Sequence, residues 1–95
     1  MTDLQHHVNR AARAKALIED DLLAPAFRDL EAAYLAAWRA SHVNDAATRE
    51  KLFLAVNIIG KVKEHLQTII ANGKVAEAQL KFEAERAAHN KRHAR

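Results

Sequence analysis

The scarcity of helix-breaking residues constrains this chain most strongly. Its 95 residues include two glycines and one proline, whereas 21 of its 47 apolar residues are alanines. Alanine has the lowest free-energy cost of any residue in a helix, and glycine and proline have the highest. We therefore predict an all-α fold. The length of the chain indicates one helical domain over residues 1–95.

Local start and stop signals predict the first two helices. The apolar stripe of the first helix extends over about residues 3–19. The second helix is expected to begin between Asp21 and Pro25, with Asp20 or Asp21 as its N-cap, and to end near Ala40. Together they account for the N-terminal part of the domain.

The third helix is expected over about residues 46–71. Asp45 is the expected N-cap, with Asn44 as the other candidate. Asn72 and Gly73 resemble a helix stop, in which Gly73 would adopt the left-handed conformation. A partly ordered C-terminal helix would follow this stop.

The short connection between the second and third helices predicts an antiparallel hairpin, formed by about residues 22–40 and 46–71. Pairing about this loop sets Tyr34 against Leu52 and Leu30 against Val56. It also sets Gly60 opposite Ala26, which indicates either a close approach of the two backbones or a tolerated defect. The expected hairpin core consists of Phe27, Leu30, Tyr34, Leu52, Val56 and Ile59.

The third helix is apolar on more than one face. Phe53, Leu54 and Ile58 lie off the stripe that faces the second helix. One short neighbour cannot cover all of these side chains. We therefore expect a homo-oligomer whose interface includes these three residues.

The C-terminal end is basic. Residues 86–95 carry Arg86, Lys91, Arg92 and Arg95 and contain no acidic residue. No large apolar residue follows Phe82, so residues 83–95 are expected to form a flexible basic tail. Such a tail can bind the phosphates of DNA without sequence specificity, although a solvated terminus has the same composition.

The sequence contains no recognisable catalytic pattern, and we expect neither an enzyme, a cofactor nor a metal site. His89 and His93 have the spacing of two metal ligands on one helix face, but neither cysteine nor an HExxH motif accompanies them. The absence of cysteine is consistent with a reducing cytoplasm. No apolar run approaches the roughly 18 residues of a membrane span, so we expect a cytoplasmic protein without a membrane partner.

Four segments carry a resemblance to a known class of proteins: "LIED", "LEAAYLAAWRAS", "REKLFLAV" and "LQTIIANGKVAEAQL". Over about residues 11–80 the chain resembles small helical proteins of tailed phages and phage-like elements. Some members of that class look like terminase small subunits, which form rings from helical hairpins and recruit the large packaging motor. The resemblance implies a host-cytoplasmic location and a phage packaging or virion protein as a partner.

This chain departs from most terminase small subunits at its N-terminus. Only about 20 residues precede the hairpin, too few for a helix-turn-helix domain. DNA contact would therefore fall to the basic C-terminal end. The resemblance implies an oligomeric, non-enzymatic phage-type assembly or DNA-packaging factor that bridges a partner protein and DNA. The alternative is a helical adaptor or regulator that binds a single phage or host protein without DNA contact.

Overall fold

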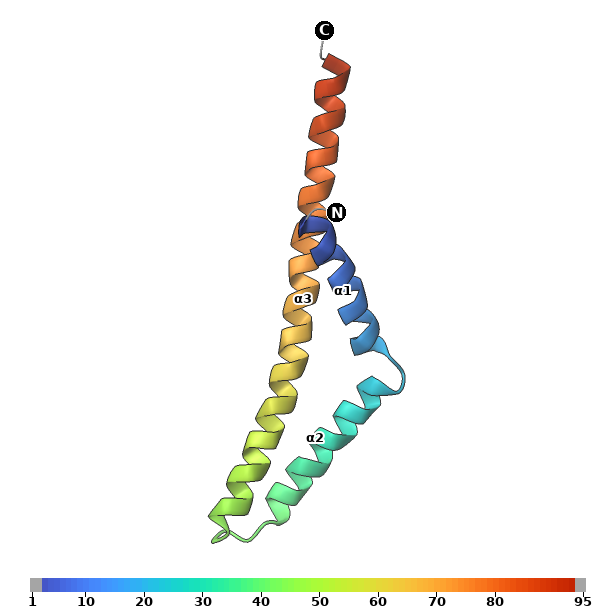
Figure 1. Ribbon diagram of the computed structural model, residues 1–95. Helices are drawn as coiled ribbons and strands as arrows, with labels where there is room; N and C mark the ends of the chain where they lie inside the picture. Colours follow the sequence, from blue (N-terminus) through green and yellow to red (C-terminus); the bar gives the residue numbers. More distant parts are fainter. Residues whose placement is uncertain (1–2, 94–95) are drawn as a thin grey trace. The chain divides into compact units, whose positions relative to one another are not determined.

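The computed structural model describes residues 3–93, with side chains described as far as Lys91, and confirms the all-helical prediction. Three helices follow one another along the chain: α1 (Asp3–Glu19), α2 (Leu23–Ala40) and α3 (Ala46–His93) (Figure 1). No strand occurs within residues 3–93. The bounds of α1 and α2 agree with those expected from the sequence.

Asp20 determines where α2 begins. Its carboxylate Oδ1 accepts hydrogen bonds from the backbone N–H groups of Leu22, at 2.9 Å, and Leu23, at 2.7 Å. These are N–H groups that have no acceptor within the helix. Asp20, rather than Asp21, is therefore the capping acceptor. Pro25 lies in the first turn of α2, where the missing N–H has no structural cost.

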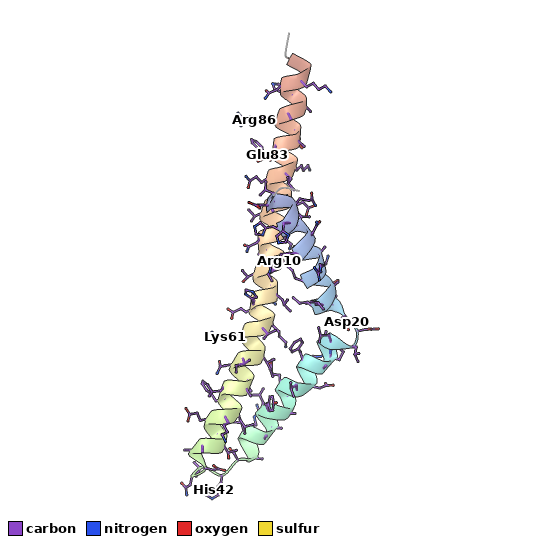
Figure 2. The ribbon with its side chains drawn as sticks, viewed as in Figure 1. Arg10, Asp20, His42, Lys61, Glu83 and Arg86 are labelled. Atoms are coloured by element: carbon purple, nitrogen blue, oxygen red, sulfur yellow. The ribbon has the colours of Figure 1, made fainter. Side chains whose placement is uncertain are left out.

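Asp45 performs the same function for α3. Its Oδ1 accepts a hydrogen bond from the backbone N–H of Thr48 at 3.2 Å. Of the two candidate N-caps, Asp45 is thus the one observed. His42, in the loop before Asp45, lies at the opposite end of α2 from Asp20 (Figure 2).

The third helix does not stop at Gly73, which corrects the sequence prediction. α3 continues for 48 residues to His93, and no described glycine has a positive φ. The predicted boundary near Ala71 and the separate C-terminal helix are therefore replaced by one continuous helix. Its last residues cover 83–93, the described part of the predicted basic tail.

The chain divides into two compact units. The hairpin unit comprises residues 16–66 and contains α2 and the first part of α3, which run antiparallel from their connecting loop (Figure 1). The terminal unit comprises residues 1–15 and 67–95 and contains most of α1 and the remainder of α3.

Within the terminal unit, α1 and α3 are in close contact at small residues. A Cβ atom at Gly73 would collide with the Cβ of Ala11 and lie 3.1 Å from the carbonyl oxygen of His7. Ala14 and Ala76 are each 3% exposed. The glycine thus permits a close approach of α1 while retaining helical geometry, which is the physical reason why α3 continues past it.

The close backbone approach that was one of the two interpretations of Gly60 is absent. A Cβ atom at Gly60 would meet nothing within 4 Å, apart from its own helix backbone. Of the two interpretations left open by the sequence, the structure agrees with a tolerated glycine. The residue is exposed and faces open space.

Candidate functional site

The six predicted core residues of the hairpin differ in burial. Ile59 is 7% exposed and is the only buried residue in residues 16–66. Leu30 is 43% exposed, although it was expected in the core. The other four are half-buried: Phe27, Tyr34, Leu52 and Val56.

One groove brings together residues from both helices near the hairpin loop. Leu35 and Trp38 of α2 line one groove together with Leu52 and Val56 of α3. Leu35 directly follows Tyr34, the expected partner of Leu52, and Tyr34 is itself half-buried.

Arg49 joins the start of α3 to the end of α2. Its guanidinium lies 4.4 Å from the centre of the Trp38 ring, and its Nη1 donates to the Trp38 carbonyl oxygen at 3.4 Å. The same nitrogen donates to Ser41 Oγ at 2.9 Å and to the Ser41 carbonyl oxygen at 3.5 Å. These bonds place the C-terminal end of α2 beside Arg49, which is one turn inside α3. The Trp38 carbonyl oxygen also accepts hydrogen bonds from the backbone N–H and the hydroxyl of Ser41.

Sequence reasoning missed this role of Arg49. The available signal was an arginine one turn after an N-cap aspartate, in a chain whose preceding helix ends in Trp38-Arg39-Ala40. An arginine at that position can reach back to the carbonyl end of the preceding helix and to an aromatic face.

One ion pair joins the two helices of the hairpin unit. Lys63 Nζ lies 3.4 Å from Glu31 Oε2, and both side chains are 36% exposed. A pair this exposed contributes at most about 1 kcal/mol to the free energy of unfolding. It shows that Lys63 occupies the side of α3 facing α2. The neighbouring Val62 is 42% exposed.

The three residues expected at the oligomer interface are all exposed on α3. Phe53 is 62% exposed, Leu54 51% and Ile58 60%. Leu54, Ile58 and Val62 recur every four residues, so they form a stripe along one side of the helix. We call this stripe, together with Phe53, the association face.

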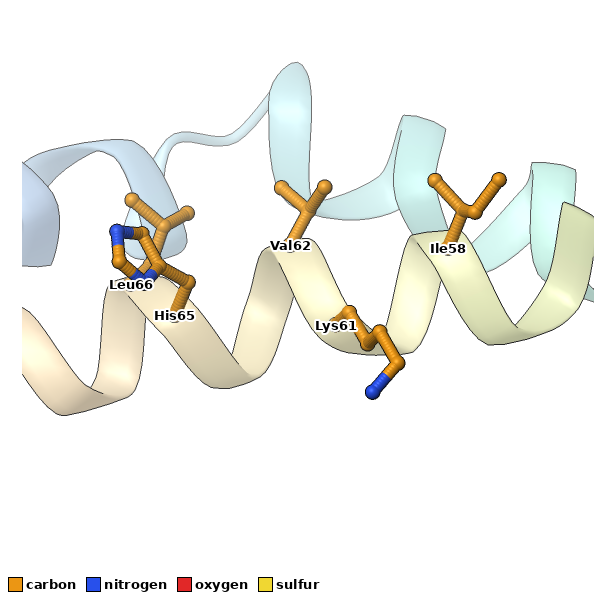
Figure 3. Close-up of a pocket in the computed structure, with 5 residues that line it drawn as sticks. All are labelled: Ile58, Lys61, Val62, His65 and Leu66. Atoms are coloured by element: carbon orange, nitrogen blue, oxygen red, sulfur yellow. The ribbon is translucent and has the colours of Figure 1, made fainter.

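A shallow groove of about 350 Å³ follows part of the association face. All of its lining residues belong to α3: Ile58, Lys61, Val62, His65 and Leu66. Ile58 and Val62 project on the same side of the helix, whereas Lys61 points away from them (Figure 3). The groove is therefore an apolar strip with a charged border.

A second groove, of about 330 Å³, lies between the two helices of the hairpin unit. Leu35, Trp38 and Phe53 each leave more than a third of their area exposed along it. Its lining is almost wholly apolar, with Asn57 as the polar exception. The hairpin unit thus presents apolar surface on α3 and also between α2 and α3.

The described members of the expected nucleic-acid contacts lie near the end of α3. Arg86 and Lys91 are exposed. Arg95 lies outside the described residues, as does the side chain of Arg92. The described part of this cluster therefore projects from a helix.

The histidines do not form a metal site with acidic groups in the described part of the chain. No group of three histidine, aspartate or glutamate side chains there is close enough to hold a metal ion. His6 and His7 have ring centres 6.2 Å apart. The side chain of His93 lies outside the description, so its spacing from His89 stays a sequence observation.

The two capping carboxylates carry the resolved electrostatic perturbations. The backbone N–H groups of Leu23 and Leu22 hold the pKa of Asp20 below its ordinary value of 3.8. The hydroxyl and backbone N–H of Thr48 lower the pKa of Asp45 in the same way. Hydrogen bonds to a carboxylate favour its ionised form. Both perturbations are explained by helix capping.

No helix within residues 3–93 combines the length and the apolar character needed to cross a membrane. Comparison of the chain with protein-family models, curated proteins and solved structures finds no match.

Proposed function

We propose that this protein is a non-enzymatic assembly factor of the phage-packaging type, whose copies associate through the association face. One observation carries the proposal: Ile59 is the only buried residue in the hairpin unit, whereas Phe53, Leu54 and Ile58 are more than half exposed. A domain of this size depends on apolar burial for its small net stability. Association supplies the burial that the hairpin lacks.

A second copy of the chain fits the association face better than a strongly charged partner. The exposed charged residues beside the stripe are two glutamates and two lysines: Glu50, Lys51, Lys61 and Glu64. The border of the stripe therefore carries no net charge and does not repel a neighbouring copy of the chain. An apolar stripe with four-residue spacing also has the geometry with which helices pack against one another.

The proposal includes DNA as the second partner. Residues 86–95 carry four fixed positive charges and no negative charge. Association would multiply this contact, because each copy adds another basic end at high effective concentration. Binding of this kind is independent of sequence and weakens steeply with salt.

Light scattering coupled to size-exclusion chromatography tests the association. We expect a multi-subunit mass for the native chain and a reduced mass for Ile58→Glu and Phe53→Glu, with helix content unchanged by circular dichroism. Val43→Glu is the matched control, since Val43 is 77% exposed in the loop, outside the association face. An unchanged mass for both α3 variants would remove the proposal.

The size of the assembly separates packaging from other roles. A closed ring of about eight or more copies favours the packaging function, because heterologous contacts close into rings. A monomer or dimer favours the second candidate, a helical adaptor that binds one protein without DNA. The groove between Leu35, Trp38 and Phe53 favours this candidate, because such grooves accept an amphipathic helix.

A further inference from the structure

Charge is unevenly divided between the two compact units. The terminal unit carries nine lysines and arginines against four acidic residues, a net charge of +5. The hairpin unit carries six against eight, a net charge of −2. The positive charge of the chain therefore belongs to one unit, and three of its basic residues come from α1, not from the C-terminal end.

Two of these residues lie on the same side of α1. Arg10 and Arg13 follow His6 at intervals of four and three residues, which places all three along one helix face. All three side chains are exposed. Within the described residues, neither arginine has an acidic group within ion-pair distance. Their charges are available to an external anion.

The contact of α1 with α3 holds these arginines in the same unit as the basic end of α3. Gly73 and Ala76 of α3 and Ala11 and Ala14 of α1 are the small residues on which the unit is built. Figure 2 labels Arg10 on α1 and Arg86 on α3, the two helices that supply the positive charge. The positive charge of the terminal unit thus lies on α1 as well as on the C-terminal part of α3.

We infer that Arg10 and Arg13 bind the phosphodiester backbone of double-stranded DNA, together with the basic residues of the C-terminal part of α3. This inference rests on the DNA contact in the proposed function and deepens it, because it extends the contact from residues 86–95 to α1. The contact is with phosphates, since arginine and lysine neutralise backbone charge irrespective of sequence.

The test compares two charge-matched double variants. Arg10→Gln/Arg13→Gln removes two positive charges from the terminal unit, and Arg28→Gln/Arg39→Gln removes two exposed charges from the hairpin unit. Binding of a fluorescent duplex is followed by anisotropy over a range of sodium chloride concentrations. Circular dichroism and light scattering establish that helix content and mass match those of the native chain.

We expect the Arg10→Gln/Arg13→Gln variant to bind more weakly and its plot of log affinity against log salt to lose about two units of slope, at about 0.9 per phosphate contact. The Arg28→Gln/Arg39→Gln control should keep the native affinity and slope. A chain lacking residues 86–95 should still bind at low salt, with a further reduced slope.

Three results would overturn the inference. The first is native affinity and slope in the α1 variant while deletion of residues 86–95 abolishes binding; the proposed DNA contact would then stand without α1. The second is an equal loss in both double variants, which would indicate a response to net charge alone. The third is no binding by the native chain at low salt, which would remove the DNA contact from the proposed function as well.

Discussion

Gly73 and Ala11 lie against each other where α1 meets α3, and no side chain larger than hydrogen fits at position 73 without movement. The Cα of Ala11 would lie 3.4 Å from a Cβ built on Gly73, and its Cβ would overlap with it. Gly60, on the same helix, has open space at the corresponding position. A side chain at position 73 would therefore collide with α1, whereas a side chain at position 60 would meet no neighbour.

This contrast predicts opposite effects of the same substitution. Gly60→Ala should raise the free energy of unfolding by about 0.5–1 kcal/mol, because alanine favours the helix and meets no neighbour. Gly73→Ala should lower it by about 1–3 kcal/mol, because α1 must move away. Urea unfolding followed by circular dichroism measures both. Stabilisation by both substitutions would show that α1 does not approach α3 at Gly73.

The contacts of Arg49 near the hairpin loop predict a loss of folding stability when this side chain is replaced. Arg49→Met should destabilise the chain by about 1 kcal/mol, since an exposed cation–π contact contributes about 0.5–1 kcal/mol and the hydrogen bonds to Trp38 and Ser41 are also lost. Arg49→Lys should recover only part of this, because an ammonium lacks the planar fork of the guanidinium. Trp38 is the only tryptophan, so its fluorescence reports directly on the contact. An emission spectrum unchanged by Arg49→Met would contradict the arrangement.

The half-buried position of Leu52 predicts a destabilising truncation. Leu52→Ala should cost about 2 kcal/mol, the low end of the range for buried leucines, because Leu52 packs beside Trp38 but is not fully enclosed. Leu54→Ala is the control in the hairpin, since Leu54 is 51% exposed. Both are compared by thermal melting in the Ile58→Glu background, where association does not contribute. Equal melting temperatures for the two variants would mean that Leu52 lies outside the hairpin core.

The lowered pKa values of Asp20 and Asp45 predict a loss of stability in acid. A carboxyl whose pKa is depressed by folding contributes stability that is present above its unfolded pKa and is lost as pH falls through the folded value. The relevant window therefore lies below the ordinary value of 3.8. Asp45→Asn keeps a capping acceptor but cannot titrate. Its melting temperature should match the native chain near pH 6 and decline less steeply below pH 3.8; parallel curves would exclude a contribution from Asp45.

Local chemistry alone determined most of the helix ends. Asp20 and Asp45 supply carboxylate acceptors to N–H groups two or three residues away, and Pro25 is compatible only with a first turn. These interactions involve neighbours in sequence, so their consequences were predictable before any tertiary contact was known. The exposed positions of Phe53, Leu54 and Ile58 also agree with the helical periodicity of the sequence.

Contacts between distant residues decided what the sequence left open. A glycine near position 73 is compatible with a helix stop or with a close helix contact, and the presence of Ala11, 62 positions earlier, selected the second. Arg49 of α3 bonds to Trp38 and Ser41 at the end of α2, a contact that the periodicity of neither helix reveals. Periodicity identifies which face of a helix is apolar, but steric fit and hydrogen bonding between helices determine which residues of two such faces meet.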